Sequence, residues 1–258
     1  EIIFRKMEFA QTSIEILSSD NGILTDDEVS TLRKATTTTQ LTEEFNKGIK
    51  SDFKIAVASE HTDPVFFAKQ LIEMLDGKRE IKVKYGKAPV ASDIKALYII
   101  TKHDGLPIKS LLNYDIPKII HFSITTLGGT KWEPGVMKAD DLLDRIESFI
   151  KQGLDPSSIT LRVDPIIPFV TKMEDVEHIV KRASGMGIKK VRFSVMDHYP
   201  TTSQFMTKLG YDYSKAYNKA PDGSYYMHAK KEVLDVIMTK MATLKDKYGV
   251  TLSTCAEP

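Results

Sequence analysis

Charged and hydrogen-bonding side chains follow nearly every strand that the sequence predicts. The apolar runs 53–59, 96–102, 118–126, 158–167, 189–199 and 250–256 each have the composition of a buried strand. Their ends carry Ser59 to Asp63, Thr101 to Asp104, Thr125 to Gly135, Arg162 to Pro165, Met196 to Tyr199 and Thr254 to Glu257. Because the carboxyl ends of parallel strands meet at one edge of a sheet, these groups are expected to form one functional face. Solvated loops alone also place polar residues at strand ends, so each group taken singly has a plain structural reading.

Arg162 and Asp164 are the most informative of these residues. Arg162 lies between Leu161 and Val163 inside an apolar run, and Asp164 lies two residues further on, so both side chains belong to the same face of the strand. A buried charge is costly unless it is paired. The spacing therefore predicts an Arg162–Asp164 pair, which either is structural or holds a ligand carboxylate or phosphate.

Other strand-end residues each allow two readings. Lys102 ends its run, where a desolvated amine could form a Schiff base or bind an anion, or simply extend its charge into water. Gly128 and Gly129 would let the backbone approach a ligand closely, or form a plain turn. Trp132, the only tryptophan, stands in the same loop as a ligand contact or as part of a packed lid.

The predicted elements alternate between strand and helix. Helical patterns occupy 63–75, 139–153, 174–187 and 231–249, and a further short strand is predicted at 80–85. Gly153, Gly187 and Gly249 close helices shortly before the next strand. The glycine-rich turn of a doubly wound sheet is missing after the first strand. We therefore expect an α/β fold of the (β/α) TIM-barrel type, partial and with about six to eight strands.

Two segments differ from this regular pattern. Residues 1–50 are rich in Thr and Ser and are expected to be an N-terminal extension, which leaves 51–258 as the barrel domain. Residues 200–230 form a Tyr-rich insertion, whose length is typical of a functional lid or interaction segment. The structural alternative is a cap over the mouth of the barrel.

Composition excludes several classes of protein. The 258 residues carry 36 basic and 35 acidic side chains, so the formal net charge of +1 gives no electrostatic case for a nucleic-acid partner. No apolar run is long enough to span a membrane, and one cysteine suits a reducing, cytoplasmic compartment. A single thiolate also cannot hold an iron–sulfur cluster, which needs three or four.

Taken together, the strand-end motifs resemble a group of functionally uncharacterised bacterial proteins related to the radical S-adenosylmethionine (radical SAM) superfamily, distantly like spore photoproduct lyase. The resemblance covers residues 53–258 and leaves 1–50 and most of 200–230 unmatched. The matching residues are Ser59, Thr62, Asp63, Thr101, Lys102, Phe122, Thr125, Gly128, Glu133, Pro134, Arg162, Asp164, Pro165, Ser194, Asp197, Thr254, Cys255, Ala256 and Glu257.

The resemblance implies a barrel that binds S-adenosylmethionine (AdoMet) or a related small molecule at the strand ends. The implied catalytic residues are Lys102, Asp164, Asp197, Cys255 and Glu257. The implied cofactor-binding residues are Ser59, Thr62, Asp63, Thr125, Gly128, Gly129, Arg162 and Ser194. A small-molecule substrate is expected, and no membrane association.

This chain departs from the family pattern in two places. The family carries two arginines where this chain has Glu60 and His61, which weakens an anion-binding role there. Its cysteine segment, inferred to hold a 4Fe-4S cluster, lies beyond the motif that contains Cys255 and Glu257. We therefore expect these two residues to be the last rim element before the cluster segment. Either that segment lies outside these 258 residues, or this chain is a relative that has lost the cluster.

Two other functions remain open at this point. The first is a zinc- or manganese-dependent hydrolase or isomerase, although the spacing matches no known metal motif. Its ligands would come from His61, Asp63, His103, Asp104, Asp164, Asp197, His198 and Glu257. The second is a non-catalytic barrel that binds a ligand or partner through the Tyr-rich insertion.

Overall fold

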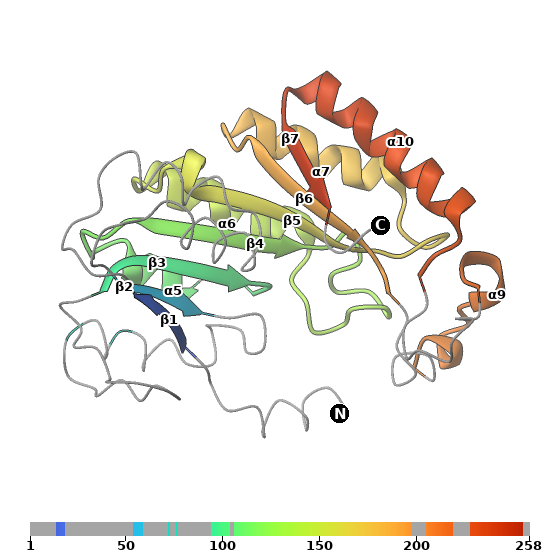
Figure 1. Cartoon of the computed structure of the whole chain (residues 1–258), viewed down its shortest axis with the longest axis horizontal. Helices are drawn as coiled ribbons and strands as arrows, with labels where there is room; N and C mark the ends of the chain where they lie inside the picture. The colour runs from blue at the N-terminus through green and yellow to red at the C-terminus, as the bar shows by residue number, and fades with distance from the viewer. Residues whose placement is uncertain are drawn as a thin grey trace. The chain divides into compact units, whose positions relative to one another are not determined.

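The computed structural model describes residues 14–18, 54–58, 72, 76, 94–103, 106–197, 205–218 and 228–254. The strands are β1 (Ile14–Ser18), β2 (Lys54–Ala58), β3 (Ile94–Thr101), β4 (Lys118–Ile124), β5 (Ile159–Ile166), β6 (Lys190–Val195) and β7 (Thr251–Thr254). The helices are α5 (Leu106–Leu111), α6 (Ala139–Lys151), α7 (Met173–Gly185), α9 (Tyr213–Ala216) and α10 (Lys231–Tyr248), with a 3-10 turn, η3 (Pro156–Ser158). Figure 1 labels these strands and α-helices.

The strands form one sheet in chain order, from β1 to β7. The pairs β2–β3, β3–β4 and β6–β7 are parallel, as expected for strands joined by crossover helices. The α/β class predicted from the sequence is therefore confirmed, whereas closure into a barrel stays a prediction. β1 pairs with β2 in the antiparallel direction, so part of the expected N-terminal extension joins the sheet. The predicted strand 80–85 and nearly all of the predicted helix 63–75 lie outside the described residues.

The chain divides into two compact units, which are described separately. The first comprises residues 1–122 and 148–160, and the second comprises residues 123–147 and 161–258. In the first unit, the ring of Phe122 on β4 stacks on Phe149 of α6, with 6.4 Å between centroids. On the opposite face of β4, the Nε2 atom of His121 lies 3.1 Å from the hydroxyl of Tyr98 on β3. Both of these polar side chains are fully buried.

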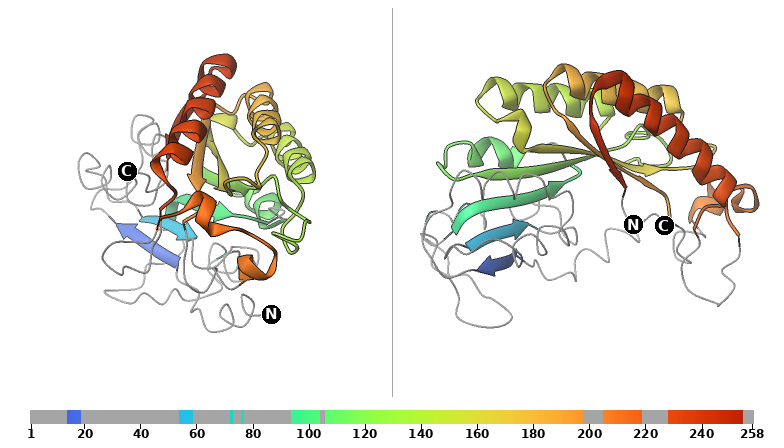
Figure 2. Two further views of the ribbon diagram at one scale, coloured as in Figure 1. Left: turned by 90° about the vertical axis from the view of Figure 1, so that its right-hand side faces the viewer. Right: turned by 45° about the horizontal axis from the view of Figure 1, so that its top comes forward.

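In the second unit, helices α7 and α10 lie over one face of strands β6 and β7 (Figures 1 and 2). Val176, Ile179, Val180 and Ala183 of α7 are buried, as are Ile237, Met241 and Leu244 of α10. The Ser184 hydroxyl donates to the Tyr248 carbonyl, which ties the ends of the two helices together. Gly249 ends α10 in the left-handed conformation, at φ 59°, which a glycine adopts without steric penalty.

Ion pairs join α6 to α7 on the exposed side of the helices. Arg182 contacts the carboxylates of Asp140, Asp144 and Glu147, and His178 Nε2 lies 2.7 Å from Asp140 Oδ1. The hydrogen bond with His178, assisted by Arg182, holds the pKa of Asp140 below its usual range. A carboxylate whose folded pKa is depressed stabilises the fold above its unfolded pKa of about 3.9 and loses that effect as the pH falls through its folded pKa.

We expect Asp140→Asn to lower the free energy of unfolding at pH 7 by about 0.5–1 kcal/mol, the range for exposed ion-pair networks. The difference from the unmodified chain should shrink as the pH falls below about 4, because Asp140 is protonated first in the unfolded state and then, as the pH passes its lower folded pKa, in the folded state as well. Urea unfolding at pH 7 and pH 3 measures this, with Asp141→Asn as the neighbouring control. A difference that does not depend on pH would contradict the expectation.

Candidate functional site

One face of the sheet in the second unit carries polar side chains, although the strands are buried. On β5 the apolar residues Leu161 and Val163 alternate with Arg162 and Asp164. On β6, Val191, Phe193 and Val195 alternate with Arg192 and Ser194. The apolar side chains of β5 and β6 face the covering helices. The opposite face of the sheet therefore carries the alternating polar residues Arg162, Asp164, Arg192 and Ser194.

The neighbouring strands extend this polar face. Ser253 of β7 is the register partner of Arg192 and so shares its side of the sheet. On β4, Phe122 faces α6, so Ser123 and, just beyond the strand, Thr125 belong to the other side. We call these residues the polar face: Ser123, Thr125, Arg162, Asp164, Arg192, Ser194 and Ser253.

Arg162 and Asp164 form the ion pair that the sequence predicted. The Nη2 atom of Arg162 lies 3.2 Å from Oδ2 of Asp164. The Arg162 side chain is 8% exposed and that of Asp164 is 29% exposed, so the pair lies at the transition from buried sheet to solvent. A guanidinium and a carboxylate held side by side offer complementary partners to a zwitterionic ligand.

Arg192 is a second buried guanidinium that sequence reasoning missed. Its side chain is on the same polar face, and the residue is only 4% exposed. The signal was available, since Arg192 stands between Val191 and Phe193 in the same way that Arg162 stands between Leu161 and Val163. His121, buried in β4 of the first unit, was also missed, although it likewise stands between two apolar residues, Ile120 and Phe122.

The loop after β4 is closed by its own hydrogen bonds. The Thr125 hydroxyl accepts from the amide of Leu127, the Gly129 amide donates to the Glu133 carbonyl, and the Thr130 amide donates to the Leu127 carbonyl. A Cβ added to Gly128 would lie 2.0 Å from the Met137 carbonyl oxygen. The protein's own backbone thus explains the need for glycine at 128, and a ligand at Gly129 would find its amide already engaged.

An aromatic cluster covers the ends of the strands in the second unit. Tyr211 contacts the ring edges of Trp132 and Tyr213, and Tyr213 contacts Tyr217. The Tyr211 hydroxyl donates to the Pro168 carbonyl after β5, and the Tyr217 hydroxyl donates to the Met196 carbonyl after β6. The described part of the Tyr-rich insertion therefore lies against the loops that follow β4, β5 and β6. We call Trp132, Tyr211, Tyr213 and Tyr217 the aromatic cap.

Burial keeps the phenols of this cap neutral. It raises the pKa of Tyr211 and of Tyr213 to about 12, and it raises the pKa of Tyr217 further. The Lys131 ammonium lies 4.7 Å from the centroid of the Trp132 ring and donates to the Leu209 carbonyl. The Tyr211 and Tyr217 hydroxyls of the cap thus act as hydrogen-bond donors at neutral pH.

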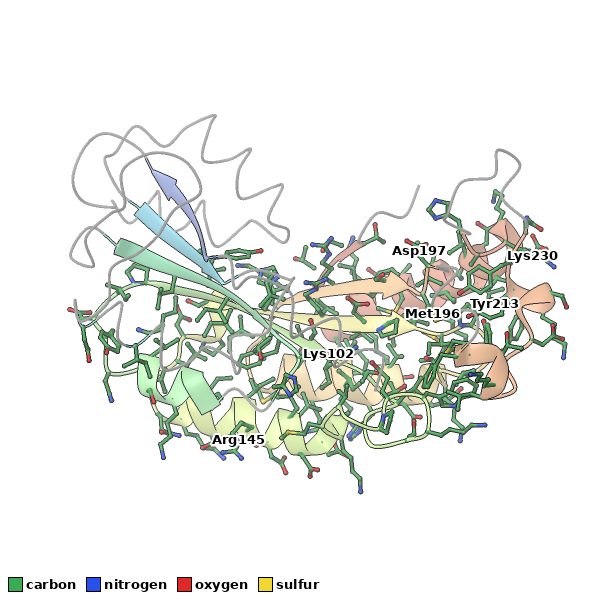
Figure 3. The ribbon with its side chains drawn as sticks, turned by 90° about the horizontal axis from the view of Figure 1, so that it is seen from below. Lys102, Arg145, Met196, Asp197, Tyr213 and Lys230 are labelled. Atoms are coloured by element: carbon green, nitrogen blue, oxygen red, sulfur yellow. The ribbon has the colours of Figure 1, made fainter. Side chains whose placement is uncertain are left out.

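Asp197 has a partner that the sequence did not indicate. It follows β6, and its Oδ1 atom lies 3.1 Å from Nδ1 of His228, at the far end of the Tyr-rich insertion. Figure 3 labels Asp197 beside Met196, together with Tyr213 and Lys230 of the elements around it. No local pattern links residues 31 positions apart, so only the tertiary structure could identify this pair.

The remaining predicted site residues are only partly placed. Lys102 follows β3 in the first unit and is half-buried, next to Thr101, whose hydroxyl accepts from the His103 amide. Ser194 is half-buried on the polar face. The residues Ser59, Thr62, Asp63, Cys255 and Glu257, and the alternative metal ligands His61, Asp104 and His198, lie outside the described residues.

The profile of one protein family matches residues 55–258, and its description is a domain of unknown function, DUF1848. The chain belongs to the DUF1848 family. No curated protein matches this chain.

Solved structures of spore photoproduct lyase are similar to this DUF1848 chain. For a cysteine mutant of that lyase the TM-score is 0.54 at 14% sequence identity, over 84% of this chain and 65% of the lyase chain. A structure of the lyase with bound AdoMet and dinucleoside spore photoproduct gives a TM-score of 0.51 at 14% identity, over 84% of this chain and 64% of the other. The chain thus spans slightly less than two thirds of the lyase. At this identity the likeness establishes the fold alone.

The glycine at 128 can be tested by its effect on stability. Gly128→Ala should destabilise the protein by about 2 kcal/mol, because backbone atoms around Met137 must move to admit the methyl group. Gly135→Ala is the matched control, since a Cβ there meets nothing within 4 Å. Thermal unfolding of both variants measures the difference, and equal melting temperatures would contradict this explanation.

The ion pair can be tested by removing one partner and then both. Arg162→Met should cost about 2 kcal/mol, less than a fully buried pair would, because the Asp164 carboxylate retains some contact with water. Adding Asp164→Leu to that variant should restore part of the loss, since no unpaired charge then remains. Urea unfolding gives both values. A double variant less stable than Arg162→Met would show that the Asp164 carboxylate is not destabilising when its partner Arg162 is removed, which would contradict the expectation.

Proposed function

We propose that this DUF1848 chain is the AdoMet-binding portion of a radical SAM-like enzyme. AdoMet, or a closely related small zwitterion, binds at the polar face under the aromatic cap. The observation that carries the proposal is the Arg162–Asp164 ion pair. A second buried arginine, Arg192, belongs to the same face of the sheet. Buried charges on a sheet face are costly, so two buried guanidinium groups on one face mark a candidate binding site. The lyase-like fold supports the proposal.

The residues of this chain suit the charged end of such a ligand. Arg162 presents a planar guanidinium that pairs with a carboxylate through two parallel hydrogen bonds. Asp164 and Asp197 supply carboxylates for an ammonium group. When bound, AdoMet supplies a sulfonium centre whose carbon–sulfur bonds can be cleaved. The protein orients the ligand and, through the aromatic cap, limits the access of water.

The iron–sulfur cluster implied by the resemblance does not fit these 258 residues alone. Cys255 is their only cysteine, whereas a 4Fe-4S cluster takes three or four thiolate ligands. Among the described residues, no three His, Cys, Asp or Glu side chains gather as metal ligands. We therefore assign no reaction step to a cluster here.

The same site indicates what kind of ligand the protein binds. The polar face and cap suit a small molecule, and structures of the similar lyase contain a dinucleoside spore photoproduct. The described part of the chain has no helix that is long and apolar enough to cross a membrane. The substrate of the proposed enzyme is accordingly expected to be a small molecule that binds next to AdoMet.

Equilibrium dialysis with radiolabelled AdoMet tests the proposal. The unmodified chain should bind AdoMet, and Arg192→Met should weaken binding by at least about tenfold, the equivalent of one lost charge-assisted contact. Arg145→Met is the matched control, because Arg145 lies on α6 and not on the polar face (Figure 3). Absence of binding, or equal loss in both variants, would contradict the proposed site.

A further inference from the structure

The pair formed by Asp197 and His228 has the geometry of an acid–base dyad. The carboxylate oxygen accepts hydrogen bonds only, so the Nδ1 atom of His228, 3.1 Å away, must carry the proton. In the neutral imidazole, the Nε2 atom then carries the lone pair. The imidazole is 53% exposed, whereas the Asp197 carboxylate is 25% exposed, so the base faces outward and the carboxylate behind it is more shielded.

The backbone on both sides of this dyad is fixed by hydrogen bonds. Met196, the residue before Asp197, donates its amide to the Ile166 carbonyl and accepts from the Tyr217 hydroxyl. Ala229, the residue after His228, pairs with Tyr217 in an antiparallel bridge. The Lys230 amide also donates to the Ala216 carbonyl at 2.7 Å. The same tyrosine therefore holds the neighbours of both dyad residues.

The other titratable groups next to the dyad are engaged elsewhere. Tyr217 donates to the Met196 carbonyl, and burial raises its pKa, so it stays neutral. The Lys230 ammonium donates to the Ser214 carbonyl, and the Lys231 ammonium pairs with Asp235. Within the described residues, Asp197 is accordingly the charged group bound to the imidazole of His228.

We propose that His228, oriented by Asp197, is the proton-transfer group of the strand-end site and acts on a ligand with an ionisable hydroxyl or ammonium group. The Nε2 lone pair takes the proton, a new N–H bond forms, and the electron pair of the broken O–H or N–H bond stays on the ligand. Asp197 stabilises the resulting imidazolium. The dyad itself does not depend on AdoMet. Only its location at the ligand site rests on the proposed function.

His178 provides a matched control in the same chain. Its side chain is 51% exposed and it also contacts an aspartate, but through Nε2, which lies 2.7 Å from Asp140 Oδ1. Two histidines of equal exposure therefore differ in which ring nitrogen is available. An electrophilic reagent that reacts with the Nε2 lone pair separates a dyad with an outward-facing base from an ordinary surface ion pair.

Diethyl pyrocarbonate supplies the test, because imidazole nitrogen attacks its carbonyl carbon, forms an N–C bond and expels ethyl carbonate. Mass spectrometry of peptides gives the labelling rates of His228 and His178 separately. We expect His228 to react faster, and Asp197→Asn to slow it roughly tenfold, the lower end of the cost of losing a carboxylate that orients an imidazole. Asp140→Asn should leave the His228 rate unchanged.

Labelling in the presence of AdoMet separates the two proposals. Protection of His228 at AdoMet concentrations that saturate binding in dialysis would support the dyad at the ligand site. If AdoMet binds without protecting His228, that location is wrong while the proposed function stands. If AdoMet does not bind, the proposed function fails, and the dyad is judged by the Asp197 effect alone. A His228 rate equal to that of His178, or unaffected by Asp197→Asn, would overturn the dyad.

Discussion

A guanidinium within a sheet must have acceptors next to it, and this requirement organises the second unit of the protein. Arg162 meets it through Asp164, 3.2 Å away on the same strand and face. The pair can lie there because the opposite face of the same strand is apolar and buried. The sheet is therefore two-sided: one face stabilises the fold, and the other concentrates charge where the strands end.

The covering elements follow from this division. Helices α7 and α10 bury the apolar face, and ion pairs around Arg182 link α6 to α7 on their solvent side. The aromatic cap contacts the loops after β4, β5 and β6 through Trp132, Pro168 and Met196. The neutral phenols of Tyr211 and Tyr217 donate hydrogen bonds to backbone carbonyls without adding charge, so the charge of the site remains with the arginines and carboxylates of the strands.

Sequence patterns predicted what depends on local periodicity. The strands from β2 to β7, the helices α6, α7 and α10 and the Arg162–Asp164 pair all follow from periodicity along the chain, and the structure confirms them. The same alternation would have identified Arg192. The Asp197–His228 contact could not be read in this way, because it depends on where a long insertion returns. Gly128 was expected either to let the backbone approach a ligand or to form a plain turn. The Met137 carbonyl next to it is a through-space contact that no spacing rule contains.

The most direct test of the central claim, that the polar face binds AdoMet, is ultraviolet cross-linking of radiolabelled AdoMet followed by peptide mapping. The proposed function predicts that label appears on peptides containing the ends of β5 and β6, around Arg162 to Asp164 and Arg192 to Asp197, and that excess unlabelled AdoMet prevents it. Label confined to other peptides, such as those of α6 and α7, or no competed label at all, would contradict it.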